Sequence, residues 1–223
     1  WGTVDQKYKV STDNGCTWSE DVMLREEWGC VFRNKPIVLA NGDFILGTSA
    51  PGGSRFLISE DQGATWFYTE SVPGVPNGHP TLIQRADGSL FALLRPHGAG
   101  HRPGALPRIG RSQSFDNGRT WIEATYTDLP NHGAAFDMVK LQDGRVVLVF
   151  NNSETDRTRL TLALSEDEGE TWRVMRDLEP PPDGGQSTAT AGTTTAGQSP
   201  RPPGTYEYPA IIQDRAGLLH VTY

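Results

Sequence analysis

The chain has little cysteine and no long hydrophobic run. Two cysteines in 223 residues, Cys16 and Cys30, cannot form the dense disulfide framework of small secreted domains, and we expect both to be free thiols. No apolar stretch approaches the roughly 18 residues of a transmembrane helix, which predicts that no segment spans a membrane. No secretory leader is visible, but residue 1 is Trp, so the sequence leaves the cellular compartment open.

Net positive charge is also missing. The formal charge is −7 at pH 7, which argues against a nucleic-acid partner because phosphate binding needs a basic surface. Of the 20 basic residues, 16 are arginine. A guanidinium pairs with a carboxylate through two hydrogen bonds, so this composition is compatible with a small anionic ligand. Surface solubility and the base composition of the gene explain an arginine excess equally well.

Motifs for cofactors and metals are absent too. The sequence has no Gly-x-Gly-x-x-Gly after a predicted strand, no P-loop and no serine-centred nucleophile elbow, so we expect no cofactor. His97 and His101 lie in a glycine-rich loop without a cysteine or carboxylate nearby, and we expect no metal site there.

What the chain does contain is four copies of one eight-residue pattern, Ser-x-Asp-x-Gly-x-Thr-Trp. The copies start 48, 55 and 51 residues apart, at positions 11, 59, 114 and 165. A period of about 50 residues is typical of four-stranded β-propeller blades and is too long for leucine-rich or ankyrin repeats. The chain is therefore predicted to be a series of all-β modules.

The composition of the pattern predicts a tight turn between two strands. Its aspartate is expected to accept backbone N–H groups two residues on, its glycine to supply a positive φ, and its tryptophan to be buried between blades. The spacing differs from that of a calcium-binding loop, so the predicted role is structural. The four aspartates are Asp13, Asp61, Asp116 and Asp167.

A second repeat lies between these turns and consists of two apolar runs on either side of a glycine. Asn-Gly or Asp-Gly stands at three of the four tips, which predicts β-hairpins. The nearly continuous apolar runs indicate strands that are buried on both faces. The four glycines are Gly42, Gly88, Gly144 and Gly217. Residues 180–204, rich in Pro, Thr and Gly, interrupt the repeat and are predicted to form a disordered surface loop.

The four turns resemble the Asp-box, or BNR, repeats of the sialidase-like propellers. Residues 33–37, 93–96, 128–131, 136–139 and 206–213 resemble the predicted-neuraminidase branch of that superfamily. The resemblance covers the chain apart from the insertion. It implies a single domain over residues 1–223, truncated at both ends, with about four to five blades of a propeller that has six blades in the family.

This resemblance implies a glycoside hydrolase of the exo-sialidase type. Sialidases hold the carboxylate of a terminal sugar between three arginines, attack the anomeric carbon with a tyrosine that a glutamate activates, and use an aspartate as acid and base. A phenol suits this attack because the substrate's own carboxylate would repel a second carboxylate. The implied partner is a glycan that ends in sialic acid or a related keto-acid sugar, cleaved with retention of configuration.

Three residues match family positions. Tyr208 stands nine residues before its hairpin glycine, where the family has its nucleophile. Arg95, seven residues after Gly88, and Arg157, eight residues before Ser165, match two of the arginines that hold the carboxylate. The first arginine and the acid/base aspartate are expected in an N-terminal blade that this sequence does not contain.

The hairpin register predicts, independently of the family resemblance, which polar residues lie at one end of the blades. Arg33, His79 and Tyr208 each stand nine residues before a hairpin glycine, so equivalent strand positions should bring them to the central axis. Asp137 stands seven residues before its glycine and shares that strand face. An aspartate ahead of a buried strand is costly unless it is paired or catalytic. Glu207 is a poor base for Tyr208, because neighbours on a strand point to opposite faces.

Asp137, with His79 second, is therefore the candidate to assist Tyr208. The alternatives are a cap at the start of a strand for Asp137, a plug in the propeller channel for Tyr208, and inter-blade hydrogen bonds for Arg33 and His79. Two functions stay open at this point. One is a retaining exo-glycosidase; the other is a non-catalytic propeller that binds glycans or proteins.

Overall fold

A computed structural model describes residues 3–28, 30–98, 105–179 and 204–223 of the chain. The predicted insertion at 180–204 lies outside these residues, apart from its last glycine. The described residues form 17 β-strands and no helix, which confirms the all-β prediction. A search of the same residues finds no helix with the length and hydrophobicity needed to cross a bilayer.

The strands form five antiparallel sheets that follow the order of the chain. The first sheet pairs β1 (Thr3–Tyr8) with β2 (Val22–Trp28). The second has the order β3 (Val31–Phe32), β5 (Phe44–Ala50), β6 (Gly53–Ser59), β7 (Phe67–Tyr68), and β4 (Ile37–Val38) also pairs with β5. The third has the order β11 (Thr125–Pro130), β10 (Arg108–Ser114), β9 (Leu90–Pro96), β8 (Asn77–Gln84). The fourth runs β12 (Asp137–Lys140), β13 (Val146–Asn151), β14 (Leu160–Ser165), β15 (Arg173–Glu179). The last sheet pairs β16 (Ala210–Gln213) with β17 (Leu219–Thr222).

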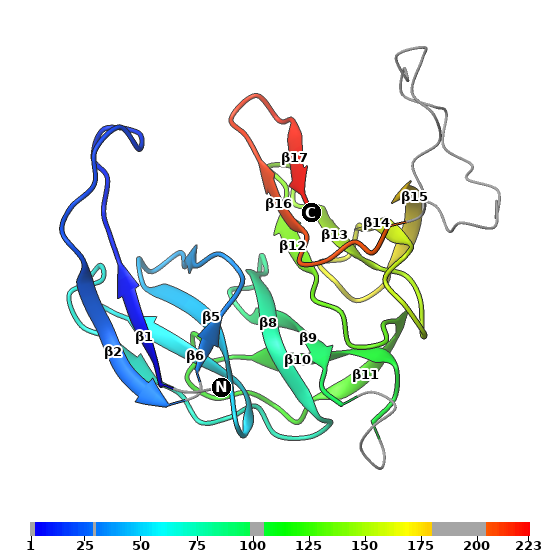
Figure 1. The fold of residues 1–223 in the computed structure, drawn as a ribbon, viewed down its shortest axis with the longest axis horizontal. Helices are drawn as coiled ribbons and strands as arrows, with labels where there is room; N and C mark the ends of the chain where they lie inside the picture. Colours follow the sequence, from blue (N-terminus) through cyan, green and yellow to red (C-terminus); the bar gives the residue numbers. More distant parts are fainter. Residues whose placement is uncertain (1–2, 29, 99–104, 180–203) are drawn as a thin grey trace.

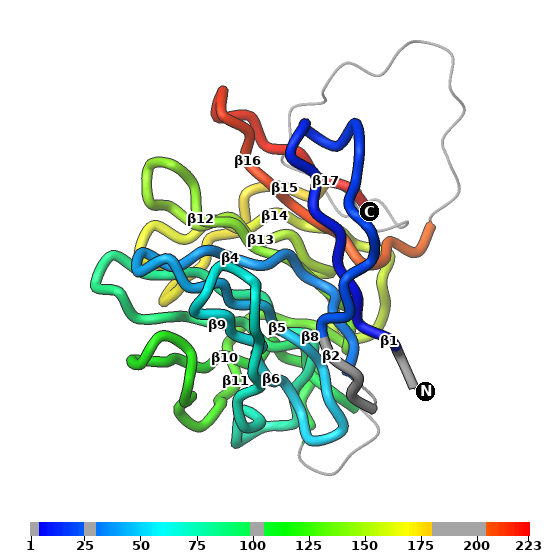
Figure 2. Tube along the Cα trace, turned by 90° about the vertical axis from the view of Figure 1, so that its left-hand side faces the viewer, coloured from blue at the N-terminus to red at the C-terminus, as the bar shows by residue number. Residues whose placement is uncertain are grey.

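The sheets are arranged around a common centre, with β1–β2 and β16–β17 at the two ends of the arc (Figure 1). The first strands of the last three sheets lie side by side, because β8 contacts β12 and β12 contacts β16. Figure 2 shows the molecule from the side of β1 and β2. The innermost strands therefore run side by side, as in a propeller.

Hydrophobic side chains fill the spaces between consecutive sheets. Ile45 and Phe56 of the second sheet pack with Leu90 and Leu94 of the third. The next space joins the third and fourth sheets, and a third one brings Ile211 of the last sheet against the fourth. Because the third and fourth sheets each lie between two neighbours, their strands β9 and β13 are buried along almost their whole length, as the sequence predicts.

All four predicted hairpin tips are present. Gly42, Gly88, Gly144 and Gly217 have φ values of 93°, 89°, 90° and 88°. Each glycine N–H donates to the carbonyl oxygen three residues earlier, at 2.9 to 3.1 Å. At Gly144 nothing lies within 4 Å of the place where a Cβ would stand, so the backbone conformation and not lack of space requires glycine there.

The Asp-box turns are held by one repeated set of hydrogen bonds, which differs in one detail from the prediction. In the third box the Asp116 carboxylate accepts the backbone N–H of Thr120 at 2.9 Å and its hydroxyl at 2.6 Å. The bonded N–H is thus four residues on, not two, because the carboxylate spans the whole turn. Asp13, Asp61 and Asp167 make the same two bonds. Hydrogen bonds from the box threonine and serine lower the pKa of Asp13 and of Asp61 to about 2.

The box tryptophans are not equally buried. Trp121 is 8% exposed and stacks on Phe56 of the neighbouring blade, with ring centroids 4.1 Å apart. Trp18 is 60% exposed, so the prediction of burial between blades is wrong for the first box. The first sheet has only two strands in the described part of the chain, and the ring of Trp18 packs on its own turn. Cys16, in the same turn, is an exposed free thiol, whereas Cys30 is buried.

Candidate active site

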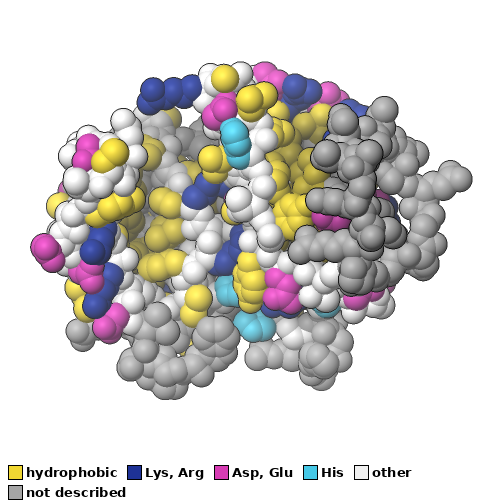
Figure 3. Space-filling view, turned by 45° about the horizontal axis from the view of Figure 1, so that its top comes forward, with side chains coloured by type: hydrophobic (Ala, Val, Ile, Leu, Met, Phe, Trp, Pro, Cys, Tyr) yellow, Lys and Arg dark blue, Asp and Glu magenta, His cyan; other side chains and the backbone are white. Residues whose placement is uncertain are grey.

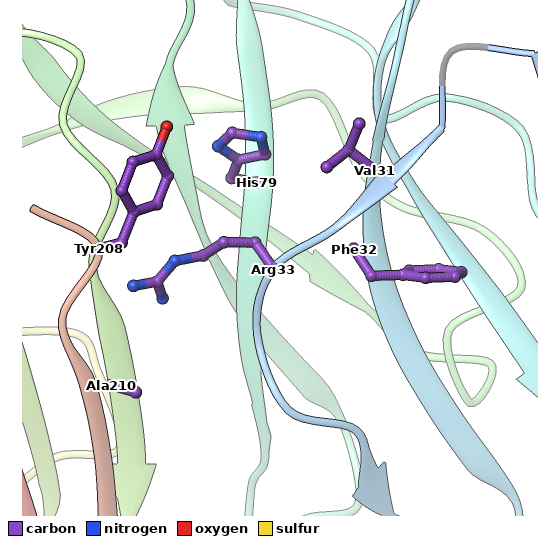
Figure 4. A pocket seen from close by; sticks show the side chains of 6 residues that line it. All are labelled: Val31, Phe32, Arg33, His79, Tyr208 and Ala210. Atoms are coloured by element: carbon purple, nitrogen blue, oxygen red, sulfur yellow. The ribbon is translucent and has the colours of Figure 1, made fainter. Parts of the chain in front are cut away.

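A hollow of about 330 Å³ lies where three inner strands begin, and its lining includes Arg33, His79 and Tyr208 (Figure 4). Arg33 precedes β4, His79 lies near the start of β8, and Tyr208 stands two residues before β16. The structure thus brings together the three residues that stand nine positions before a hairpin glycine. The Asp-box turns of the second, third and fourth sheets follow β6, β10 and β14, and the antiparallel order puts them at the opposite end of the sheets from this hollow. Figure 3 shows Lys, Arg and His side chains gathered near the middle of the face that it draws.

Tyr208 is held in an unusual backbone conformation. Its φ is 53°, a left-handed value that costs free energy for a non-glycine residue, and such residues are concentrated at functional sites. The side chain is 48% exposed and borders the hollow. The Arg33 guanidinium carbon lies 5.8 Å from the centroid of its ring, within the range of a cation–π contact. Burial lowers the pKa of Arg95 and the phenol of Tyr208 opposes that change, which indicates that the two side chains lie near each other. Two cationic side chains therefore surround the tyrosine.

Arg33 links the hollow to two later segments of the chain. Its Nη1 donates to the carbonyl oxygen of Phe136 at 2.9 Å, and its Nη2 donates to the carbonyl oxygen of Pro209. Burial lowers the pKa of Arg33, and the negative charge of Asp137 opposes that change. Part of its hydrogen-bonding capacity is thus committed to holding the tyrosine segment in place, as the inter-blade alternative predicted.

His79 carries no charge in this setting. Its Nδ1 lies 2.7 Å from Nη1 of Arg95, and because a guanidinium has no acceptor, Nδ1 must accept and the ring proton is assigned to Nε2. Burial, followed by the charges of Arg95, His97 and Arg33, lowers the pKa of His79 to about 4. While the bond to Arg95 lasts, neither ring nitrogen is available to take a proton from Tyr208. These contacts therefore argue against His79 as the general base that takes the proton of Tyr208.

Of the two predicted carboxylate-binding arginines, Arg95 interacts with Tyr208 and Arg157 with the adjacent Glu207, and neither belongs to the described lining of the hollow. Arg95 donates from Nε to the carbonyl oxygen of Gly133 at 2.6 Å, and burial lowers its pKa. Arg157 forms an ion pair with Glu207 at 2.6 Å between Nη1 and Oε1. The charge of Arg157 also contributes to the lowered pKa of Arg95. Glu207 thus faces an arginine and not the phenol.

Asp137 lies apart from the lining of the hollow. Its side chain is 2% exposed and accepts four hydrogen bonds. Oδ1 accepts the hydroxyl of Thr81 and the N–H of Met138, both at 2.9 Å. Oδ2 accepts the ammonium of Lys35 at 2.7 Å and the N–H of Ile211 at 3.1 Å. Since a carboxylate has about four lone-pair sites, none is left for the phenolic proton of Tyr208. The prediction that Asp137 assists Tyr208 directly therefore does not match these contacts.

The partners of Asp137 explain its position. Lys35 and Thr81 each stand seven residues before a hairpin glycine, as Asp137 does, so the three occupy equivalent places in neighbouring blades. Sequence reasoning missed Lys35 and Thr81, although the register that singled out Asp137 could have found them. They follow Arg33 and His79 by two residues, and Ile211 follows Tyr208 by three. One buried carboxylate thus connects the strands that carry all three residues of the hollow.

A metal would need different side chains. Across residues 3–28, 30–98, 105–179 and 204–223, no three His, Cys, Asp or Glu side chains are grouped so that they could hold an ion. His101, half of the histidine pair considered from the sequence, lies outside these residues.

The blades and their packing define the chain as a β-propeller of the sialidase type. The NanB sialidase of Streptococcus pneumoniae, as its K499G mutant, superposes with a TM-score of 0.69 over 96% of this chain and 32% of its own, at 21% identity. An intramolecular trans-sialidase from Ruminococcus gnavus gives a TM-score of 0.67 over 96% of this chain and 45% of its own, at 20% identity. At these identities the likeness shows the fold alone.

Residues 1–221 match the family of BNR repeat-like domains, and the chain belongs to that family. A curated sialidase of Micromonospora viridifaciens is 26% identical over 200 residues, which are 77% of this chain and 29% of that protein. The chain therefore spans between 29% and 45% of the length of these three proteins.

Proposed function

We propose that this chain carries the tyrosine and arginine part of the active site of a retaining exo-glycosidase, which releases an anionic terminal sugar such as sialic acid or a related keto-acid sugar. One observation carries the proposal. The phenol of Tyr208, fixed by a left-handed backbone, borders the hollow with Arg33 and Arg95 beside it. Cationic groups at that position stabilise negative charge on the attacking oxygen and on the sugar's carboxylate.

Arg95 and Arg157 bind the carboxylate of the sugar. Arg157 pairs with Glu207, the residue before Tyr208, and Arg95 interacts with the phenol of Tyr208 and with the charge of Arg157. The ion pair between Arg157 and Glu207 is partly exposed, and such pairs contribute only about 0–1 kcal/mol. A substrate carboxylate can therefore replace Glu207 at small cost.

Tyr208 forms the covalent bond in the first step. The phenolic oxygen attacks the anomeric carbon while the bond from that carbon to the leaving oxygen breaks, and a water molecule later displaces the tyrosine. One carboxylate must take the phenolic proton, and an acid must protonate the leaving oxygen. No carboxylate belongs to the described lining of the hollow. We therefore place these groups in segments of the protein beyond this chain.

Asp137 is a positioning residue in this proposal. Its bond to the N–H of Ile211 fixes the strand that follows Tyr208, and its bonds to Lys35 and Thr81 fix the strands that follow Arg33 and His79. It acts on the reaction through these strands and touches no reacting atom.

The test is hydrolysis of a fluorogenic aryl sialoside by the full-length protein that contains this chain. We expect turnover by the wild-type protein and a loss of at least about a hundredfold in kcat for Tyr208→Phe, which keeps the ring and removes the attacking oxygen. The matched control is Tyr206→Phe, which makes the same change at a tyrosine two residues earlier. Wild-type turnover in the Tyr208→Phe variant would refute the assignment of the nucleophile.

The pairing of Arg157 with Glu207 and the lack of a carboxylate in the described lining favour a second candidate, a propeller that binds glycans without cleaving them. This alternative predicts that a sialoside binds but is not turned over by the full-length protein. It also predicts that Tyr208→Phe weakens binding only by the loss of one hydrogen bond.

A further inference from the structure

A second hollow, of about 480 Å³, opens beside the first one. It is lined by residues 50–53, which join β5 to β6, by residues 72–77, which lead into β8, and by His97, which follows β9. All three segments lie at the end of the blades where the inner strands begin. Its volume is in the range of small-molecule sites, which is about 300–1,000 Å³.

Among the described residues, no charged side chain lines this second hollow. They contain three glycines and three prolines, so backbone groups and pyrrolidine rings form much of the described surface. The imidazole of His97 is exposed at the edge. An ionised ligand would lose hydration there without gaining a counter-charge, whereas the hydroxyl groups of an uncharged molecule can bond to backbone groups.

The shape of the second hollow is fixed by hydrogen bonds. Asn77 accepts the N–H of Ser54 at 2.8 Å and donates to the carbonyl of Val75 at 2.8 Å, which joins the two loops. On the other side, the N–H of Ala124 donates to the carbonyl of Pro73 at 2.8 Å. A site that is formed before its ligand arrives avoids the entropic cost of ordering loops on binding.

The two hollows are neighbours along β8. Asn77 lines the second hollow and His79 lines the first, and two strand residues span only about 7 Å. Between them stands Gly78, where a Cβ would lie 3.0 Å from Nδ1 of His97 and 2.8 Å from Oγ of Ser49. The glycine lets His97 lie against the strand. After burial and Arg95, His97 also contributes to the lowered pKa of His79, which agrees with this proximity.

We propose that the second hollow binds the uncharged sugar to which the anionic terminal sugar is linked. This inference rests on the proposed function, because it needs the anionic sugar to be bound at Tyr208. A glycan held there must continue across the same face. Toward Arg157 and Glu207 that face is charged, whereas past His79 and Gly78 it leads into the uncharged hollow. The hollow therefore selects the glycan beyond the cleaved bond.

Binding of a neutral disaccharide tests the second hollow without relying on hydrolysis. The probe is lactose, observed by saturation-transfer NMR on the full-length protein. Pro73 is exposed and has no N–H to lose, so Pro73→Trp fills the hollow without removing a backbone hydrogen bond. We expect a lactose signal from the wild-type protein and its loss in Pro73→Trp and in His97→Ala. His220→Ala, which removes an exposed histidine at the last hairpin, is the matched control and should keep the signal.

The kinetic readout is a ratio of two substrates. We expect Pro73→Trp to lower kcat/KM for sialyllactose about tenfold relative to an aryl sialoside that has no second sugar. An unchanged ratio, or a lactose signal that is absent from the wild-type protein or survives Pro73→Trp, overturns the inference. If the wild-type protein hydrolyses neither sialoside, the proposed function fails, while loss of the lactose signal in the variants still supports the second hollow as a site for neutral sugars.

Discussion

The buried carboxylate of Asp137 accepts the backbone N–H of Ile211 at 3.1 Å, and Ile211 follows Tyr208 by three residues. The same oxygen accepts the ammonium of Lys35. Asp137, in the fourth sheet, thus binds the Lys35 ammonium from the second sheet and the Ile211 N–H from the last sheet through one oxygen. The position of the tyrosine depends on contacts between blades that are far apart in the sequence.

Removal of the Asp137 carboxylate should destabilise the protein strongly. Asp137→Ala leaves Lys35 and three further donors without their acceptor, and breaking a buried ion pair costs about 3–5 kcal/mol. Asp137→Asn keeps one acceptor oxygen and should cost clearly less. The free energy of unfolding in urea measures both, with Asp143→Asn at an exposed hairpin tip as control. Equal stability of Asp137→Ala and wild type would contradict the role of the carboxylate as a cross-blade anchor.

The pH–rate profile separates a positioning role for Asp137 from a direct one. If Asp137 only orients Tyr208, Asp137→Asn should lower kcat by a similar factor at every pH and leave the shape of the profile unchanged. Loss of one limb of the profile in this variant would show that Asp137 itself carries a proton in the reaction.

Stability should depend on pH through His79. Its pKa is about 4 in the folded protein and near 6.5 in the unfolded chain, so the unfolded state binds more protons between these values. The stabilisation is present above pH 6.5 and is lost as the pH falls toward 4. Asn accepts a hydrogen bond, tolerates the φ of 38° and does not titrate. His79→Asn should therefore reduce the slope of unfolding free energy against pH in this window, and an unchanged slope would be the contrary result.

The two tryptophans Trp121 and Trp18 occupy the same place in their boxes but should differ in energetic weight. Trp121→Ala removes a buried ring that stacks on Phe56, and we expect a cost of about 3–5 kcal/mol. Trp18→Ala removes a ring that is 60% exposed and should change stability by about 0.5 kcal/mol or less. Chemical denaturation of both variants measures the difference. Similar costs would mean that Trp18 is covered in the full-length protein.

Gly144 and Gly169 have similar φ values, so alanine substitutions at the two positions separate the cost of the left-handed conformation from the cost of a steric clash. Gly144 has φ 90° and open space around it, so Gly144→Ala should cost only the left-handed conformation, about 1–2 kcal/mol. Gly169 has φ 98°, and a Cβ there would lie 2.4 Å from Cε1 of Phe91 in the neighbouring blade. Gly169→Ala should therefore cost more, by about 1–3 kcal/mol. Equal melting temperatures of the two variants would argue against this close contact between blades.

The ion pair of Arg157 with Glu207 competes with the substrate's carboxylate in the proposed mechanism. Glu207→Gln removes the competing charge, and since exposed pairs contribute about 0.2–1 kcal/mol, KM should fall by a factor of about 1.4 to 5. The value of kcat should not change. A large decrease in kcat would instead assign Glu207 a part in proton transfer.

Much of the fold follows from local signals. The boxes and hairpin glycines define each blade because a tight turn needs those residues whatever surrounds it. The same glycines set the strand register, which correctly brought Arg33, His79 and Tyr208 to one hollow. Exposure of Trp18 was not predictable, because burial depends on whether a neighbouring blade covers the ring.

The contacts within the site were less accessible from the sequence. Three of the four bonds to Asp137 come from other segments and the fourth from the adjacent Met138, and only the three-dimensional arrangement shows that they use up the carboxylate. The left-handed backbone of Tyr208 has no local signal, since Tyr rarely adopts it and Pro209 follows. The uncharged state of His79 depends on Arg95, which is 16 residues away in sequence.

Arg33 donates to the carbonyls of Phe136 and Pro209, which lie 103 and 176 residues further along the chain. The hollow is thus assembled from segments that are far apart in the sequence, whereas the hairpins and box turns of each blade join segments that are close in the sequence. On heating, separation of the blades should abolish ligand affinity at a lower temperature than the one at which the strands themselves melt. The hollow should consequently lose its shape before the hairpins and box turns within the blades unfold.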